Sequence, residues 1–145
     1  MSSTHVPEFL KRLVRRRSEN RCEYCLLSQA GQEATFHIDH VRPFAEGGET
    51  NADNLALACV SCSLRKGAKR FAVDPKTHAR VKIFNPRKDR WERHFKWEGL
   101  KIKGLTGTGR ATVEMLNMNR TLIIAIRREE LLAGRSLDRD DRREE

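Results

Sequence analysis

Two pairs of cysteines, each spaced C-x2-C, constrain the fold of this chain more than any other feature. The pairs are Cys22 with Cys25 and Cys59 with Cys62, and 33 residues separate them. Four thiolates in such an arrangement can bind one structural zinc ion, because thiolate sulfur is a preferred zinc ligand. Two disulfides in a secreted protein are the alternative. We see neither a signal peptide nor an apolar run of membrane-spanning length, so we expect a cytoplasmic protein without membrane contact whose reduced cysteines bind Zn²⁺.

The composition favours the same interpretation and adds a class of partner. Only 38% of the 145 residues are apolar, so the core is small and a metal would help to stabilise it. Lys and Arg outnumber Asp and Glu by 29 to 20, which gives a net charge of +9. This excess favours a polyanion such as DNA as the partner, with a merely soluble basic surface as the alternative.

Hydrophobic periodicity predicts an α+β fold. Residues 7–18 are expected to form a helix with an apolar stripe, and residues 35–44 a strand that Pro43 interrupts. A second helix should run from Val60 to Lys66 or Ala68, ending near Gly67. Further along, the pattern predicts the following elements: an edge strand at 79–84, a hairpin around Glu98-Gly99, and helices near 111–117 and 120–133. The apolar stripe of the first helix contains Phe9, Leu10, Leu13 and Val14.

These elements divide the chain into four expected parts. The first is an N-terminal basic helix, and the second is a zinc-stapled core. A C-terminal α+β extension with a β-hairpin and helices follows, and a charged tail that we expect to be disordered ends the chain. Their boundaries are residues 1–20, 21–70, 71–134 and 135–145.

The gap between the cysteine pairs is longer than in an ordinary zinc ribbon, and it contains Asp39-His40. Several separated stretches agree in order and spacing with the HNH endonuclease family, which the segment from about residue 20 to 70 therefore closely resembles. The stretches are residues 21–25 (RCEYC), 38–43 (IDHVRP), 47–48 (GG), 54–55 (NL) and 58–62 (ACVSC).

This resemblance implies a ββα-metal core and metal-assisted hydrolysis of phosphodiester bonds in DNA, with RNA as an alternative substrate. It implies that His40 is the general base, that Asp39 binds a catalytic divalent cation, and that Asn54 orients the loop and the base. The chemistry of the side chains agrees, because imidazole accepts protons near neutral pH and carboxylate oxygen suits Mg²⁺ or Mn²⁺. On a regular strand Asp39 and His40 would point to opposite faces, so we expect a bend near them.

Ser63 departs from the family pattern, which commonly has Asn or His there as a further metal ligand. The serine hydroxyl is expected to bind the catalytic cation directly, to bind it through water, or to mark a weakened site. A weakened site would favour a second function, a zinc-stabilised nucleic-acid-binding module without cleavage activity. A structural zinc protein that recruits another protein through its C-terminal helices is the third alternative.

Other polar residues have weaker signals. His37 lies two residues before Asp39, on the same face of the strand, and either contributes to the site or forms a structural hydrogen bond. Arg42 is a candidate for binding the scissile phosphate. Four basic residues on or just after the second predicted helix are expected to contact the nucleic-acid backbone, with solvated surface charge as the alternative: Arg65, Lys66, Lys69 and Arg70. Three aromatic residues predict a satellite core: Trp91, Phe95 and Trp97.

Overall fold

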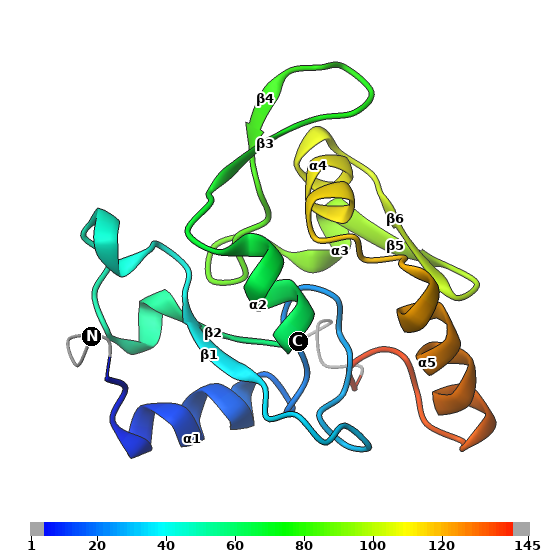
Figure 1. Cartoon of the computed structure of the whole chain (residues 1–145), viewed down its shortest axis with the longest axis horizontal. Coiled ribbons are helices and arrows are strands. Elements are labelled where there is room, and N and C mark those ends of the chain that lie inside the picture. Colours follow the sequence, from blue (N-terminus) through cyan, green and yellow to red (C-terminus); the bar gives the residue numbers. More distant parts are fainter. Residues whose placement is uncertain (1–4, 141–145) are drawn as a thin grey trace.

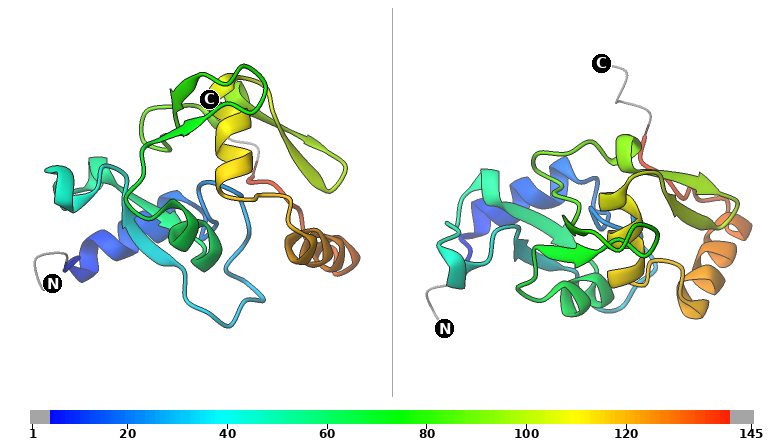
Figure 2. Two further views of the ribbon diagram at one scale, coloured as in Figure 1. Left: turned by 45° about the horizontal axis from the view of Figure 1, so that its top comes forward. Right: turned by 90° about the horizontal axis from the view of Figure 1, so that it is seen from above.

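A two-stranded hairpin between two helices forms the part of the molecule that contains the cysteines (Figure 1). The computed structural model describes residues 5–140. Helix α1 contacts β2, and helix α2 contacts both strands, so the hairpin lies between the helices (Figures 1 and 2). Small antiparallel sheets combined with helices confirm the predicted α+β class. The bounds are α1 (Glu8–Arg17), β1 (His37–His40), β2 (Leu55–Ala58) and α2 (Val60–Lys66).

Helix α1 lies within the range that periodicity predicted. Leu10 and Val14 are buried against the core, and the Arg17 guanidinium donates a hydrogen bond to the Leu55 carbonyl on β2 (2.6 Å). Phe9, however, is 63% exposed, so its assignment to the buried stripe was wrong. One residue turns a helix by about 100°, which takes Phe9 off the face that Leu10 and Val14 share.

Strand β1 is shorter than the strand predicted over residues 35–44. It pairs antiparallel with β2, whose four residues are all buried, and it ends at His40. Pro43 explains the early end, because it has no N–H to donate to a sheet and a turn follows it directly. Residues 41–54 therefore form a loop between the strands. Two 3₁₀ turns lie in this loop: η2 (Phe44–Glu46) and η3 (Ala52–Asn54).

The C-terminal extension (residues 71–134) contains two further hairpins and three helices. Its β3–β4 hairpin packs beside α4, where Arg110 binds the buried Asp74 carboxylate through two nitrogens at 2.8 and 3.0 Å (Figure 1). No helix between residues 5 and 140 is long and apolar enough to cross a membrane. The bounds are β3 (Phe71–Val73), β4 (Arg80–Lys82), α3 (Trp91–His94), β5 (Phe95–Glu98), β6 (Lys101–Gly104), α4 (Gly107–Met115) and α5 (Thr121–Leu132).

Helix α4 begins earlier than the predicted start near residue 111. The Thr106 hydroxyl caps the helix by accepting a hydrogen bond from the Gly109 N–H (3.0 Å), so the helix begins at Gly107, four residues before that point. Gly109 lies inside this helix, and a Cβ there would lie 2.1 Å from the His94 carbonyl oxygen. The glycine therefore permits close packing of α4 against the end of α3.

One hydrophobic core extends through both parts of the chain. The Trp91 indole N–H donates to the Tyr24 carbonyl (2.9 Å), and the Trp91 and Phe95 ring centroids lie 5.1 Å apart. Trp91 and Phe95 are buried in the same cluster as the four cysteines, and Trp97 packs against it. The prediction of a separate satellite core was therefore wrong.

The segment after α5 contacts the rest of the fold at several points among the described residues. Arg135 pairs with Glu130 (2.6 Å), the Arg21 side chain donates to the Ser136 carbonyl (2.8 Å), and Arg139 pairs with Glu92. Three arginines thus connect residues 135–140 to the fold, and the disorder of the charged tail stays a prediction. Residues 141–145 lie outside the described residues.

Candidate functional site

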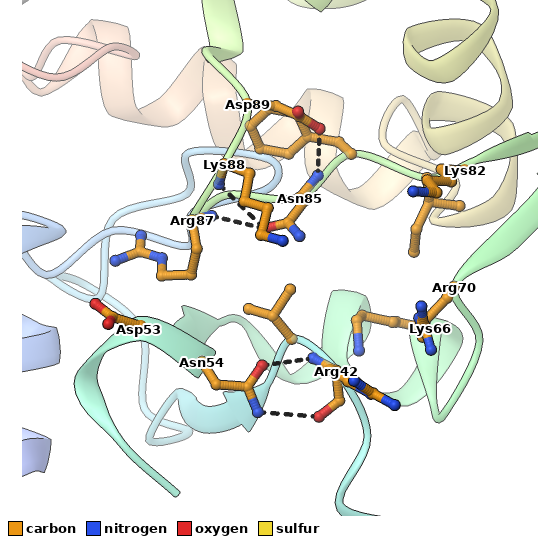
Figure 3. A pocket seen from close by; sticks show the side chains of 13 residues that line it. Arg42, Asp53, Asn54, Lys66, Arg70, Lys82, Asn85, Arg87, Lys88 and Asp89 are labelled. Carbon is orange, nitrogen blue, oxygen red and sulfur yellow. Dashed lines mark hydrogen bonds between the residues drawn. The ribbon is translucent and has the colours of Figure 1, made fainter. Parts of the chain in front are cut away.

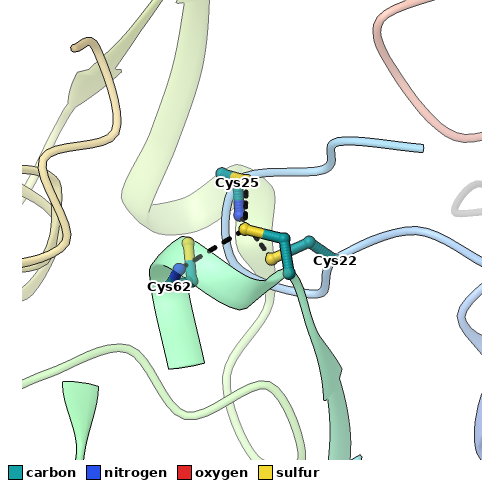
Figure 4. A group of neighbouring side chains, drawn as sticks. Cys22, Cys25 and Cys62 are labelled. Atoms are coloured by element: carbon teal, nitrogen blue, oxygen red, sulfur yellow. Dashed lines mark hydrogen bonds between the residues drawn. The ribbon is translucent and has the colours of Figure 1, made fainter. Parts of the chain in front are cut away.

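The four cysteines converge where β2 meets α2 (Figure 4). Cys59 caps the N-terminus of α2, Cys62 lies in its first turn, and Cys22 and Cys25 come from the turn between α1 and β1. Their sulfur atoms all lie within 4.8 Å of one another, and those of Cys25 and Cys59 are 3.7 Å apart. With Zn–S bonds of about 2.3 Å, a tetrahedral site separates sulfurs by about 3.8 Å, so the cluster fits zinc.

The cysteines are buried and none forms a disulfide, which excludes the alternative of two bridges. The Cys25 and Cys62 N–H groups each donate to the sulfur of the first cysteine in their pair, at 3.4 Å. Burial raises the pKa of the Cys22 thiol, because charge is costly away from water. A bound cation such as the predicted structural zinc would offset this cost.

The last two residues of β1 bind different partners. The Asp39 carboxylate accepts a hydrogen bond from the Ser63 hydroxyl on α2 (3.1 Å), whereas His40 Nε2 lies 2.7 Å from the Thr50 hydroxyl in the 41–54 loop. Both side chains are half-buried. Burial lowers the pKa of His40, and the Asp39 carboxylate opposes this by raising it. The imidazole is therefore neutral at pH 7.

His37 lies in the same group as Asp39. Its Nδ1 is 2.7 Å from the Ser63 hydroxyl, which in turn donates to Asp39, so Ser63 links the two residues of β1. The sequence left open whether His37 contributes to this group, and the structure brings it there. A carboxylate oxygen, a hydroxyl oxygen and an imidazole nitrogen thus meet on the side of the hairpin that faces α2. This donor set fits a small divalent cation.

A comparison with protein families identifies this part of the chain. The model described as HNH endonuclease matches residues 22–69. Residues 22–69 form an HNH domain. It includes both cysteine pairs, the β1–β2 hairpin and α2, and it covers about a third of the 145 residues. No match to the chain was found among curated proteins or among solved structures.

Within the HNH domain, Asn54 closes the loop that follows the candidate base. Its side-chain oxygen accepts from the Arg42 N–H (2.8 Å), and its nitrogen donates to the Arg42 and Glu49 carbonyls (3.1 and 2.9 Å). Gly48 lies within this closure, since a Cβ there would lie 1.9 Å from the Arg42 carbonyl oxygen. Asn54 therefore holds the loop that carries Thr50, the partner of His40.

Lys66 is not on the surface where the sequence suggested a nucleic-acid contact. It is 2% exposed, and its ammonium group donates to the His40 carbonyl (3.3 Å) and the Gly67 carbonyl (3.4 Å). Burial lowers the pKa of Lys66, while the Asp39 carboxylate raises it. The last turn of α2 packs this side chain against the hairpin, so the expected contact of Lys66 with the nucleic-acid backbone stays a prediction.

The other predicted basic residues divide between two sides of α2. Arg42 donates to the Glu46 carbonyl and Arg70 pairs with the Glu46 carboxylate, both at 2.9 Å, and both arginines line one cleft. Arg65 instead donates to the Ser61 hydroxyl (3.3 Å) and lines a different hollow, beside α5. Lys69 is exposed.

Sequence reasoning missed two contributions to the site. Thr50 has no motif of its own, and only the folded loop shows that it contacts His40. Lys82 and Arg87-Lys88 lie in the extension, yet they line the same cleft as Arg42 and Arg70. The adjacent pair Arg87-Lys88 was the only signal for them, and its place 25 residues after Cys62 concealed its position.

Proposed function

We propose that the HNH domain hydrolyses phosphodiester bonds in DNA with the help of a divalent cation, beside a structural zinc. One observation carries the proposal: a neutral imidazole and a carboxylate occupy adjacent positions at the end of β1, and each has a hydrogen-bonded partner that orients it. A net charge of +9 supports a polyanionic substrate.

His40 acts as the general base in this proposal. When its Nε2–H donates to the Thr50 hydroxyl, Nδ1 carries no proton and can accept one from the attacking water. The lowered pKa supports this role, because the ring stays unprotonated at neutral pH. Asn54 contributes as a positioning residue, because it holds the loop that carries Thr50.

Asp39 and Ser63 would bind the catalytic cation, with His37 as a third donor. Mg²⁺ or Mn²⁺ bound there would stabilise negative charge on the scissile phosphate and on the leaving 3′ oxygen. On binding, Ser63 would give up its hydrogen bond to Asp39 and offer its oxygen to the cation. The imidazole of His37 compensates for the shorter serine side chain.

Ser63 also supports the second candidate, a nucleic-acid-binding module without cleavage activity. A neutral hydroxyl is a weaker ligand than an amide oxygen or an imidazole, so the cation affinity decides between the two functions. The HNH domain would then bind DNA through its basic residues alone.

Purified protein with one zinc is expected to convert supercoiled plasmid to open circles when Mg²⁺ or Mn²⁺ is present. EDTA should stop the reaction and excess Mg²⁺ should restore it, with the zinc content measured before and after. Salt-dependent DNA binding without nicking would contradict the nuclease and favour the binding module. If the protein does not bind DNA at all, the result would favour the third alternative, a structural zinc protein that recruits another protein.

The affinity for Mn²⁺ tests the ligand set. We expect His37→Ala to weaken Mn²⁺ binding at least about tenfold, because the variant loses an imidazole donor. Ser63→Asn should strengthen Mn²⁺ binding, because an amide oxygen is a better ligand than the serine hydroxyl. Isothermal titration of the zinc-loaded protein measures both. His94→Ala is the matched control, because His94 Nδ1 makes the same 2.7 Å contact with a hydroxyl, that of Thr106, outside the HNH domain. Equal affinities in all four proteins would contradict the ligand roles.

A further inference from the structure

A cleft of about 310 Å³ separates the HNH domain from the C-terminal extension (Figure 3). One wall comes from the loop after His40 and the end of α2, and the other comes from residues 82–89 of the extension. Six cationic side chains line it, three from each part of the chain: Arg42, Lys66, Arg70, Lys82, Arg87 and Lys88. We call this hollow the basic cleft.

Positive charge in the basic cleft exceeds the negative charge that faces it. The lining contains only two acids, Asp53 and Asp89, and the Asp89 carboxylate accepts a hydrogen bond from the Asn85 N–H. Within residues 5–140, neither the Lys82 nor the Lys88 ammonium has a hydrogen-bond or ion-pair partner, and both residues are exposed. The cleft therefore offers two free cations to a ligand.

Hydrogen bonds and an ion pair hold residues 85–88, on the extension side of the basic cleft, in place without a ligand. The Asn85 side-chain oxygen accepts from the N–H groups of Arg87 (2.8 Å) and Lys88 (3.2 Å), which makes a tight turn. Arg87 also pairs with Glu23, the residue that follows the first zinc ligand. These contacts hold Lys88 on a turn that is anchored to the zinc-binding part, so little ordering is needed on binding.

The basic cleft begins next to the candidate base. Val41, the residue after His40, lines it, and the buried Lys66 both lines it and donates to the His40 carbonyl. On the same side, Asn54 holds Arg42 through the backbone. An anion bound in the cleft would therefore lie beside the strand that carries the catalytic residues.

We infer that the basic cleft binds the sugar-phosphate backbone of one strand of the substrate, and that the C-terminal extension is thus part of the nucleic-acid interface. Its volume is at the lower end for ligand sites, which suits one strand and not a whole duplex. Clustered cations that meet phosphates are the feature that gives nucleic-acid binding its affinity and its salt dependence. This inference rests on the proposed function for the identity of the polyanion.

The test is DNA binding by the Lys82→Ala/Lys88→Ala double variant in a His40→Ala background, which prevents cleavage. The probe is a short DNA duplex, and fluorescence anisotropy measures its Kd over a range of salt concentrations. We expect weaker binding and a salt slope that is shallower by about 1.8, because each lost phosphate contact removes about 0.9. Both lysines are exposed, so the unfolding temperature should not change.

Lys96→Ala/Lys101→Ala is the matched control, since it removes the same charge from the exposed β5–β6 hairpin, away from the cleft. Equal loss of slope in both double variants, or no loss in either, would overturn the inference. Plasmid nicking is measured as well, with the same lysine substitutions in protein that retains His40. This measurement distinguishes a failure of the cleft inference from a failure of the proposed nuclease function. A shallower salt slope without any nicking in the wild type would refute only the nuclease, whereas nicking with an unchanged slope would refute only the cleft.

Discussion

Replacing His40 by alanine is expected to slow plasmid nicking by about 10²–10⁴-fold, the range that a positioned general base contributes. The imidazole at the end of β1 is the candidate proton acceptor, and its lowered pKa keeps it neutral at pH 7. Its side chain lies outside the zinc cluster, so the variant should retain zinc and a similar unfolding temperature. Initial rates of supercoiled DNA loss, at matched zinc content, measure the effect.

Two further variants make this result specific. Thr50→Val removes the hydrogen bond to His40 Nε2 and should slow nicking less than His40→Ala, because the base remains but its tautomer is no longer fixed. His94→Ala alters a histidine of similar burial in the extension and should leave the rate unchanged. Equal nicking by the wild type and His40→Ala would point to a contaminating nuclease or to another catalytic group, and it would remove His40 from the mechanism.

The sequence predicted most of the zinc-binding part because its constraints are local. Two C-x2-C pairs predict a metal site whatever residues lie between them. The alternation of apolar and polar residues around Asp39 predicts a strand. The bounds of that strand were wrong by several residues, because an apolar pattern extends past Pro43 while the hydrogen bonds do not. The family resemblance assigned Asp39 and Ser63 to one cation; a 3.1 Å hydrogen bond joins the two side chains, and their role as ligands stays a prediction.

Contacts between distant segments were beyond the reach of sequence patterns. Lys66 is one of several similar cations near the end of α2, and only the packing of that turn under the hairpin distinguishes it. Lys88 and Arg42 line the same cleft because a shared core joins the extension to the HNH domain, as the hydrogen bond from Trp91 to Tyr24 shows. Periodicity describes single elements, so it carries no information about which loops face each other.

Loss of the zinc site is expected to have the largest effect on stability. Zinc binding by small structural sites supplies about 10–16 kcal/mol, while a domain of this kind is stable by only about 5–15 kcal/mol. Cys25→Ala, which removes one of the four ligands, should therefore abolish zinc retention and unfold at least residues 22–69. Circular dichroism of the thermal transition and metal analysis of the purified protein measure both effects.

Ser61→Ala is the control for this variant, because Ser61 lies in the second cysteine pair and is not a ligand. Its unfolding temperature should stay close to that of the wild type. Nicking should disappear in Cys25→Ala even with excess Mg²⁺, since Cys59 and Cys62 hold α2 against the hairpin and so keep Ser63 at Asp39. A folded Cys25→Ala protein with an unchanged thermal unfolding transition would show that core packing alone stabilises the fold and that zinc is not needed for it. The proposed structural and catalytic metals would thus be coupled through one short helix, α2, which Cys59 caps and which carries Ser63 directly after Cys62.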